Sequence, residues 1–387
     1  MQFSDIIGQE AVIQQLKDMV DNNRLSHALL FVGKEGSGAL PLALAFSTYV
    51  VSQSEKPKAT TAGLFGEEPA PATSHGGELA LQYIHPDVHY SYPVIPRKSG
   101  DKPIATDYIT EWREFIKQYP YGNLYDWLQF IGAENKQGNI TAAECADIIR
   151  KLNLKSFESE YKILVLWMPE YLGKEGNKLL KLIEEPPANT LFVLVAESED
   201  QVLPTIVSRC QTVRIPALEN EAVTTALIQR SRLNEEQARQ IAGVCEGNYR
   251  EALQLIQHAD EDWQQYLREW LNAILKTGPV AQVKWVDEIS KLGREKQKQF
   301  LRYFNHLIEQ SIRLQAMGGN LALSQQEADF ANRLNKLCSI EQLQVIVEEL
   351  DKASYYIERN ANAKMLFMAL TIKVYHAIAN KSVLLMN

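Results

Sequence analysis

Residues 28–41 read Ala28-Leu29-Leu30-Phe31-Val32-Gly33-Lys34-Glu35-Gly36-Ser37-Gly38-Ala39-Leu40-Pro41. The first five residues are an apolar run that ends at a glycine, which is typical of a strand buried on both faces of a sheet. Gly33 and Gly38 have the spacing of the phosphate-binding loop G-x-x-x-x-G-K-[ST], which connects such a strand to a helix. The stretch therefore predicts the strand, loop and helix of a P-loop fold.

Two positions of this loop lack the side chains that bind a nucleoside triphosphate. Ala39 stands where the motif has the lysine that neutralises phosphate charge, and Leu40 stands where it has the hydroxyl that binds Mg²⁺. Lys34 lies at the other end of the loop. The loop keeps the glycines that shape the turn, Gly33, Gly36 and Gly38. We therefore favour a structural turn over nucleotide binding, and expect no cofactor and no metal.

The acidic pair of a P-loop ATPase is also missing. Such an enzyme carries Asp-Glu at the end of a neighbouring strand, where the pair holds Mg²⁺ and polarises water. Here the predicted strand Lys162–Trp167 is followed by Met168, Pro169 and Glu170. Trp167 and Met168 cannot do this chemistry, and Glu170 lies past the strand end. Both losses point to a P-loop fold without ATP hydrolysis.

Further strands are predicted at residues 87–94, Lys162–Trp167, Thr190–Ala196 and Thr212–Ile215. Helices are predicted at Glu10–Val20 and at Lys174–Glu185, which ends before Pro186. Strands that alternate with helices form a parallel sheet that is covered on both faces. Residues 1–215 are therefore predicted to form one α/β domain.

Two segments of this domain differ from the rest. Residues 52–79 are rich in Pro, Ala and Thr and cannot bury a core, so we expect a mobile loop. Residues 108–131 are helical in pattern and rich in Trp, Tyr and Phe. For these aromatic residues we favour additional packing on the domain over a ligand-binding site.

The chain is predicted to be helical after Pro216. Residues 216–275 form a small helical domain with predicted helices Glu219–Ser231, Asn234–Cys245 and Arg250–His258. Residues 276–387 carry long amphipathic stretches, typical of a helical bundle, at Val280–Leu292, Glu295–Met317, Gln325–Cys338, Ile340–Arg359 and Ala361–Ala379.

Composition excludes several classes of protein. The 387 residues are 45% hydrophobic and 23% charged, so the chain can bury cores and is not predicted to be disordered. The net charge of −8 disfavours an extended basic groove for nucleic acid. The four cysteines include no Cys-x-x-Cys pair, and no secretory signal or bilayer-spanning run is visible. We expect a cytoplasmic protein with reduced thiols.

Four motifs resemble those of bacterial clamp-loader subunits. They are the strand into the P-loop at 25–33, the helix and Glu-Glu-Pro-Pro turn at 177–187, Ser208-Arg209-Cys210, and the sensor-2 helix at 247–253. Their order and spacing match over about residues 1–260. A degenerate P-loop together with a retained Ser-Arg-Cys resembles the delta-prime family of DNA polymerase III subunits, whereas the tau/gamma subunits keep the lysine and the acidic pair.

The resemblance implies an AAA+ domain at 1–215, a helical lid at 216–275 and an all-α collar that mediates oligomerisation at 276–387. It implies a subunit that does not hydrolyse ATP, in a hetero-oligomeric ring that loads the sliding clamp onto primer–template DNA. The implied partners are the tau/gamma ATPase subunits and the delta subunit, within the DNA polymerase III holoenzyme.

This chain departs from the family in two places. The family usually carries a four-cysteine zinc module after the first helix, but residues 52–79 contain no cysteine, so we expect no zinc. Residues 97–137 look like an insertion whose role the sequence does not indicate.

Arg209 is the candidate catalytic residue. A guanidinium offers a planar fork of donors to phosphate oxygens. Because Ala39 and Leu40 disable the site of its own chain, the resemblance implies an arginine finger that acts on a neighbouring subunit's ATP. A surface salt bridge or a helix cap is the alternative that residue type alone favours.

The other candidates are expected to be structural. For Arg250 we favour an ion pair that fixes the lid against the core. Cys210 is interpreted as a small buried apolar residue, and His27 and the group His85-Pro86-Asp87 as structural.

Two rival functions stay open. One is an active ATPase subunit of the tau/gamma type, which Ala39 and Leu40 oppose. The other is a stand-alone DNA-binding protein, which the acidic net charge opposes.

Overall fold

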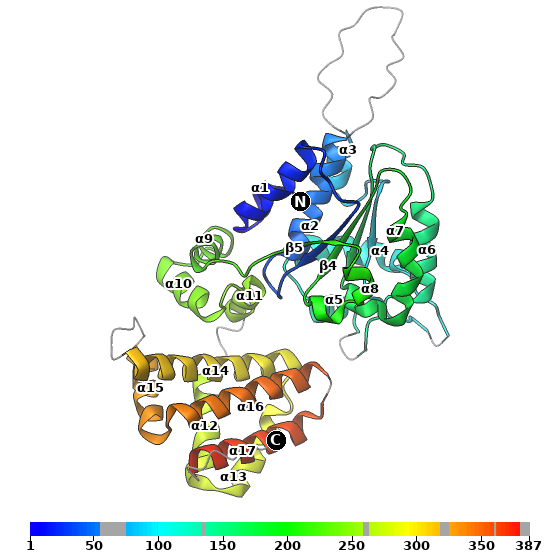
Figure 1. Ribbon diagram of the computed structural model, residues 1–387. Helices are drawn as coiled ribbons and strands as arrows, with labels where there is room; N and C mark the ends of the chain where they lie inside the picture. Colours follow the sequence, from blue (N-terminus) through cyan, green and yellow to red (C-terminus); the bar gives the residue numbers. More distant parts are fainter. Residues whose placement is uncertain are drawn as a thin grey trace, which may run out of the picture. The chain divides into compact units, whose positions relative to one another are not determined.

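The computed structural model describes residues 1–54, 75–98, 100–133, 136–257, 263–317, 325–359 and 361–379. The chain divides into two compact units, Met1–Ile256 and Gln257–Asn387. The first runs from blue to green in Figure 1 and contains a sheet flanked by helices, whereas the second is helical. Among the described residues, no helix is both long and apolar enough to span a bilayer.

The sheet of the first unit has five parallel strands in the order β2-β3-β4-β1-β5. They are β1 (Ala28–Val32), β2 (Val88–Ser91), β3 (Lys162–Trp167), β4 (Thr190–Ala196) and β5 (Gln211–Arg214). The predicted parallel α/β class is confirmed, and β1, β3 and β4 have the predicted bounds. Apart from Lys162 and Thr190 at the starts of β3 and β4, every residue of these three strands is apolar, which suits a sheet with both faces buried.

Alternate residues of each central strand enter two different cores. In β1, Leu29 and Phe31 pack in the core that includes α1 (Glu10–Asp21), α2 (Ala39–Gln53), α4 (Ile109–Gln118) and α5 (Leu124–Phe130). Ala28 and Leu30 pack on the opposite face with α6 (Ala142–Leu152), a 3₁₀ segment at Pro169–Leu179, α7 (Leu180–Glu184) and α8 (Pro204–Val207). The two-residue period of a strand produces this division.

The strand expected at 87–94 is shorter, with β2 at Val88–Ser91, and the one expected at Thr212–Ile215 is shifted by one residue; two other predicted elements differ in kind. Part of the loop expected at 52–79 is helical, because α2 continues to Gln53 and α3 spans His75–Leu81; residues 55–74 lie outside the described ones. The helix expected at Lys174–Glu185 is a 3₁₀ segment followed by the short α7. Gly173, inside the 3₁₀ segment and directly before the start of the expected helix, interrupts the helical backbone with φ +50° and ψ −144°.

The insertion at 97–137 packs onto the sheet and contributes to its core. It contains a 3₁₀ turn (Ala105–Tyr108), α4 and α5. Trp112 stacks on Tyr92 at 4.0 Å between ring centroids and meets Trp127 edge-on at 5.4 Å. The Trp127 indole N–H donates to the Pro93 carbonyl at 2.8 Å. The preference for packing over a ligand-binding site is thus confirmed for these buried rings.

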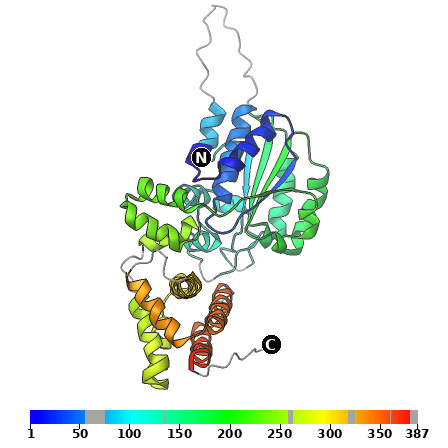
Figure 2. The ribbon, with the colours of Figure 1, turned by 60° about the vertical axis from the view of Figure 1, so that its left-hand side comes forward.

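Helices α9 (Asn220–Ser231), α10 (Glu235–Val244) and α11 (Tyr249–Gln257) form a group with its own core, visible beside the sheet in Figures 1 and 2. Val223, Leu227 and Ala252 are buried there. Ile7 and Tyr121 join this core from elsewhere in the first unit. The division of the first unit into an AAA+ domain and a lid stays a prediction.

The second unit packs its helices around stacked indoles. It contains α12 (Trp263–Asn272), a π-helical turn (Ala273–Thr277), α13 (Pro279–Ile289), α14 (Arg294–Met317), α15 (Gln325–Leu337), α16 (Ile340–Glu358) and α17 (Ala363–Ala379). The Trp270 and Trp285 rings stack at 4.9 Å, and Phe367 is buried beside Trp285. Residues 380–387, included in the predicted collar, lie outside the described residues.

Helix α12 was not predicted from the sequence. Trp263, Leu267 and Trp270 have the i, i+4, i+7 spacing of a buried helix face, so the signal was present. The structure places this helix in the second unit, whose core holds all three residues, whereas the predicted lid extends to residue 275.

Candidate functional site

The glycine-rich loop between β1 and α2 is a tight turn at the carboxyl end of β1. The Gly33 amide donates to the Ala196 carbonyl at 3.1 Å, and the Ser37 amide donates to the Lys34 carbonyl at 3.0 Å. Gly36 and Gly38 have φ of +72° and +93°, in the left-handed region that favours glycine. Two of the three predicted glycines are therefore required by the backbone of this turn.

The structure places apolar side chains where a triphosphate site needs charge. Ala39 and Leu40 are the first residues of α2 and are both buried. Trp167 and Met168 are buried at the end of β3. The Glu170 carboxylate accepts hydrogen bonds from the Glu197 and Ser198 amides at 2.7 and 3.1 Å, so it fixes the turn after β4. Burial raises the pKa of Glu170.

The cavity beside the loop is small. It has a volume of about 30 Å³ and is lined by residues 33–36, 38–41, 120–122, 167 and 195–197. Tyr121 of the insertion lies against the loop, since a Cβ on Gly38 would stand 3.0 Å from its ring. The Tyr121 hydroxyl accepts a hydrogen bond from the Ile7 amide at 2.9 Å, and burial raises the pKa of Tyr121 to about 12.

Arg250 of α11 is the centre of a buried ion cluster beside this loop. Its side chain is 3% exposed. Its Nε and Nη2 donate to the two carboxylate oxygens of Asp126 at 2.5 and 2.6 Å, and its Nη1 donates to Glu35 at 3.0 Å. The side-chain amide groups of Asn248 and Asn123 also donate to the Glu35 carboxylate, at 3.2 and 2.8 Å. The ion pair that we expected between Arg250 and an acidic residue of the core is present.

Three members of this cluster were not predicted: Glu35, Asn123 and Asp126. Asp126 and Arg250 are 124 positions apart, and Glu35 and Arg250 are 215 apart. Neither pairing has a local sequence signal. Only Glu35 could have been suspected, because it is the acidic residue of the glycine-rich loop.

Arg209 lies on the surface between α8 and β5, and its side chain is about one-third exposed. Its Nε donates to Glu184 at 2.5 Å, and its Nη1 donates to the Thr205 carbonyl at 2.6 Å. Gln211, two residues later, pairs with Leu29 near the amino end of β1. Arg209 is therefore at the amino-end side of the sheet, whereas the glycine-rich loop follows the carboxyl end.

The remaining candidates have structural surroundings. Burial raises the pKa of the Cys210 thiol to about 11, which disfavours a reactive thiolate. Asp87 accepts hydrogen bonds from the amides of residues 157–159 at 2.6 to 2.8 Å, and its own amide donates to His85 at 3.1 Å. Within the described part of the chain, no three His, Cys, Asp or Glu side chains are grouped to hold a metal ion. The absence of zinc stays a prediction.

A phosphate-loop turn between the first strand and its helix, on a parallel sheet followed by helices, defines an α/β fold of the AAA+ type with a helical C-terminal part. The family model described as "DNA polymerase III, delta subunit" matches residues 8–219, which is more than half of the chain. The chain therefore belongs to this family, and it is a delta-prime-like member.

The individual relatives are subunits of DNA polymerase III. The chain is 26% identical over 247 residues to DNA polymerase III subunit delta' of Bacillus subtilis, covering 64% of this chain and 59% of the relative. It is 24% identical over 315 residues to subunit tau of Bacillus subtilis, covering 80% of this chain and 46% of the relative. The matches thus span about half to three-fifths of these relatives.

A solved DNA polymerase III gamma subunit-related protein of Thermotoga maritima aligns over 94% of this chain and 99% of its own. The sequence identity is 17% and the TM-score is 0.39.

Proposed function

We propose that this chain is a clamp-loader subunit that does not hydrolyse ATP and that supplies Arg209 to the ATP site of a neighbouring subunit. The proposed partners are the tau/gamma ATPase subunits and the delta subunit, in a hetero-oligomer that loads the sliding clamp onto primer–template DNA. In this proposal, residues 1–215, 216–275 and 276–387 act as AAA+ domain, lid and collar.

The observation that carries the proposal is the position of Arg209. Its guanidinium is partly exposed and lies at the side of the sheet away from the glycine-rich loop of the same chain. A planar guanidinium that cannot reach its own phosphate loop is suited to a phosphate on another chain. The Ser-Arg-Cys motif of residues 208–210 adds to this argument.

The residues of the phosphate loop support the absence of hydrolysis. Ala39 and Leu40 provide no cation and no Mg²⁺ ligand, and the cavity beside them holds about 30 Å³. Triphosphate chemistry depends on a lysine, a bound Mg²⁺ and a positioned water. An active subunit of the tau/gamma type is the alternative, because tau subunits are among the relatives.

Turnover by the reconstituted clamp loader tests the proposal. With Arg209→Ala in this chain, we expect the clamp- and DNA-stimulated ATPase rate to fall because one site in the ring loses its finger. An arginine finger contributes about 10³–10⁵ in rate at its own site, and the other sites limit the total loss. Arg209→Lys should rescue poorly, since an ammonium cannot replace the planar fork.

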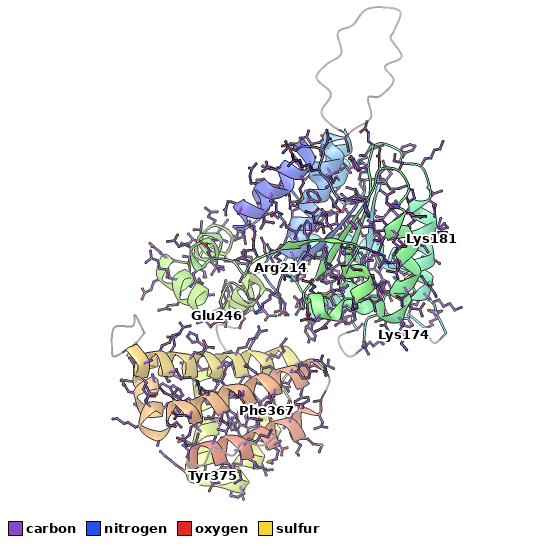
Figure 3. The ribbon with its side chains drawn as sticks, in the orientation of Figure 1. Lys174, Lys181, Arg214, Glu246, Phe367 and Tyr375 are labelled. Carbon is purple, nitrogen blue, oxygen red and sulfur yellow. The ribbon has the colours of Figure 1, made fainter. Side chains whose placement is uncertain are left out.

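Arg214→Ala is the matched control. Arg214 is also an exposed arginine of the first unit that pairs with a carboxylate, that of Glu199 at 2.8 Å, and Figure 3 labels it. Unchanged turnover with Arg209→Ala, in complexes that assemble normally, would leave Arg209 as a surface salt bridge.

A further inference from the structure

The lid helix α11 contacts the glycine-rich loop through both backbone and side chains. The Tyr249 amide donates to the Gly36 carbonyl at 3.2 Å. Asn248 lies directly over Gly36, since a Cβ built on that glycine would stand 1.9 Å from its side-chain oxygen and 2.9 Å from its Cα. Arg250, two residues after Asn248, reaches Glu35 in the same loop. The loop and this end of α11 are therefore in direct contact.

The charges at this contact are supplied by the chain itself. Arg250 is almost fully buried, and a buried guanidinium requires anionic partners with good hydrogen-bond geometry. Asp126 binds it through two parallel hydrogen bonds, the arrangement that a guanidinium also makes with phosphate. Glu35 adds a second carboxylate from within the glycine-rich loop.

We propose that Glu35 and Asp126 are internal substitutes for nucleotide phosphates, so that the lid is latched onto the glycine-rich loop without any nucleotide. Asp126 lies in the insertion at 97–137, which gives that segment a role: it carries the anion that holds Arg250. Tyr121, from the same insertion, joins the lid core and packs edge-on to Tyr249 at 5.0 Å. This latch goes beyond the proposed function, because it holds whether or not Arg209 acts on a partner.

Hydrogen exchange of the full-length chain tests the latch by two independent variants. Asp126→Asn removes the charge of the bidentate partner of Arg250. Gly36→Ala leaves every charge in place but drives a methyl group into Asn248. In both variants we expect the amides of residues 249–257 to exchange at least tenfold faster than in the wild type, whereas β3 and β4 keep their protection.

Each variant has a matched control within the insertion. Glu111→Gln removes a carboxylate that also pairs with an arginine, Arg97 at 3.1 Å, but on the surface. Gly132→Ala is the control for Gly36→Ala. Gly132 has a positive φ of +68°, similar to that of Gly36, and no atom lies within 4 Å of a methyl group added there. Both controls should leave exchange in α11 unchanged.

Three outcomes would overturn the latch. One is unchanged exchange of 249–257 in both test variants. A second is equal loss of protection in β3, β4 and α11, because the lid and the sheet would then open as one unit. The third is a slowing of α11 exchange in the wild-type chain on addition of millimolar Mg²⁺-ATP, which would mean that the site still accepts nucleotide.

Discussion

Arg209 and Glu184 form a close ion pair across the surface of the first unit. The Arg209 Nε lies 2.5 Å from Glu184 Oε1, and Nη2 contacts the same oxygen. The two side chains are 32% and 46% exposed. Exposed pairs of this kind contribute about 0–1 kcal/mol to stability. Separating the two residues therefore costs little, and Arg209 can turn toward an anion on another chain.

The first prediction concerns stability. Arg209→Ala and Glu184→Gln should each change the free energy of unfolding by less than about 1 kcal/mol, because the lost pair is solvent-exposed. Urea titrations of the full-length chain measure this. A loss of about 3 kcal/mol or more would show that the pair is part of the structural core, and would weaken the case for a mobile finger.

The second prediction is that the isolated chain does not bind Mg²⁺-ATP tightly. The wild type lacks the lysine and the hydroxyl of the loop, and Ala39→Lys with Leu40→Thr should not restore binding, since the small cavity is still lined by the Glu35 carboxylate and the Tyr121 ring. Isothermal titration calorimetry checks both proteins. A micromolar, Mg²⁺-dependent site in the wild type would favour the ATPase alternative.

The third prediction is that the purified chain holds no structural zinc. Residues 52–79 contain no cysteine, and no zinc module can form there without thiolate or comparable ligands. Elemental analysis should give well under one zinc per chain. A stoichiometric amount would require ligands elsewhere in the sequence.

Three of the five strands could be predicted from the sequence to the residue, and β2 and β5 were predicted with shifted bounds, whereas the latch could not be predicted. Strands such as Thr190–Ala196 are continuous apolar runs that pack on both sides, so the local pattern alone specifies them. Asp126 and Arg250 are charged residues of the kind usually found on the surface, and only the tertiary structure brings them together. Periodicity does not show which charged residues will be buried together.

The interpretation of the insertion illustrates the same limit. Its aromatic residues indicated packing, and Trp112 and Trp127 do pack in the main core. Asn123 and Asp126, between these rings in the sequence, carry the polar contacts to Glu35 and Arg250. The packing of the aromatic residues was predictable because the composition of the segment indicates burial. The contacts of its polar residues were not, because their partners lie at least 88 positions away in the sequence.

The fourth prediction concerns pH. Burial, aided by the nearby charge of Lys151, lowers the pKa of His89 to about 4, although Asp87 and Asp147 act in the opposite direction. Between pH 6.5 and 4, the unfolded chain therefore takes up a proton that the folded chain does not. The free energy of unfolding falls as the pH is lowered through this range, by up to about 3 kcal/mol.

His89→Gln isolates this contribution. Urea titrations at pH 7 and pH 4.5 should show that the wild type loses about 2–3 kcal/mol more than the variant on acidification. The same comparison between pH 7 and pH 8 should show no difference between the two proteins. Equal losses at low pH would mean that His89 is solvated well enough to titrate normally.

The fifth prediction separates folding of the first unit from assembly. Its three hydrophobic cores lie entirely within residues 1–256, so a chain that ends at Ile256 should fold by itself. The second unit exposes Met365, Ile372 and Tyr375 along α17, while Phe367 on the same helix, labelled with Tyr375 in Figure 3, is buried. Exposed apolar side chains on a packed helix are typical of contact surfaces between subunits.

We therefore expect the 1–256 fragment to retain the circular dichroism of an α/β protein but not to co-elute with the ATPase subunits in gel filtration. Ile372→Asp in the full-length chain should weaken co-elution without unfolding, because this side chain is about half-exposed. Glu349→Gln is the control: it neutralises a carboxylate of α16 that pairs with Lys373 of α17 and leaves the apolar side chains in place. Normal incorporation of the fragment would place the assembly surface in the first unit instead.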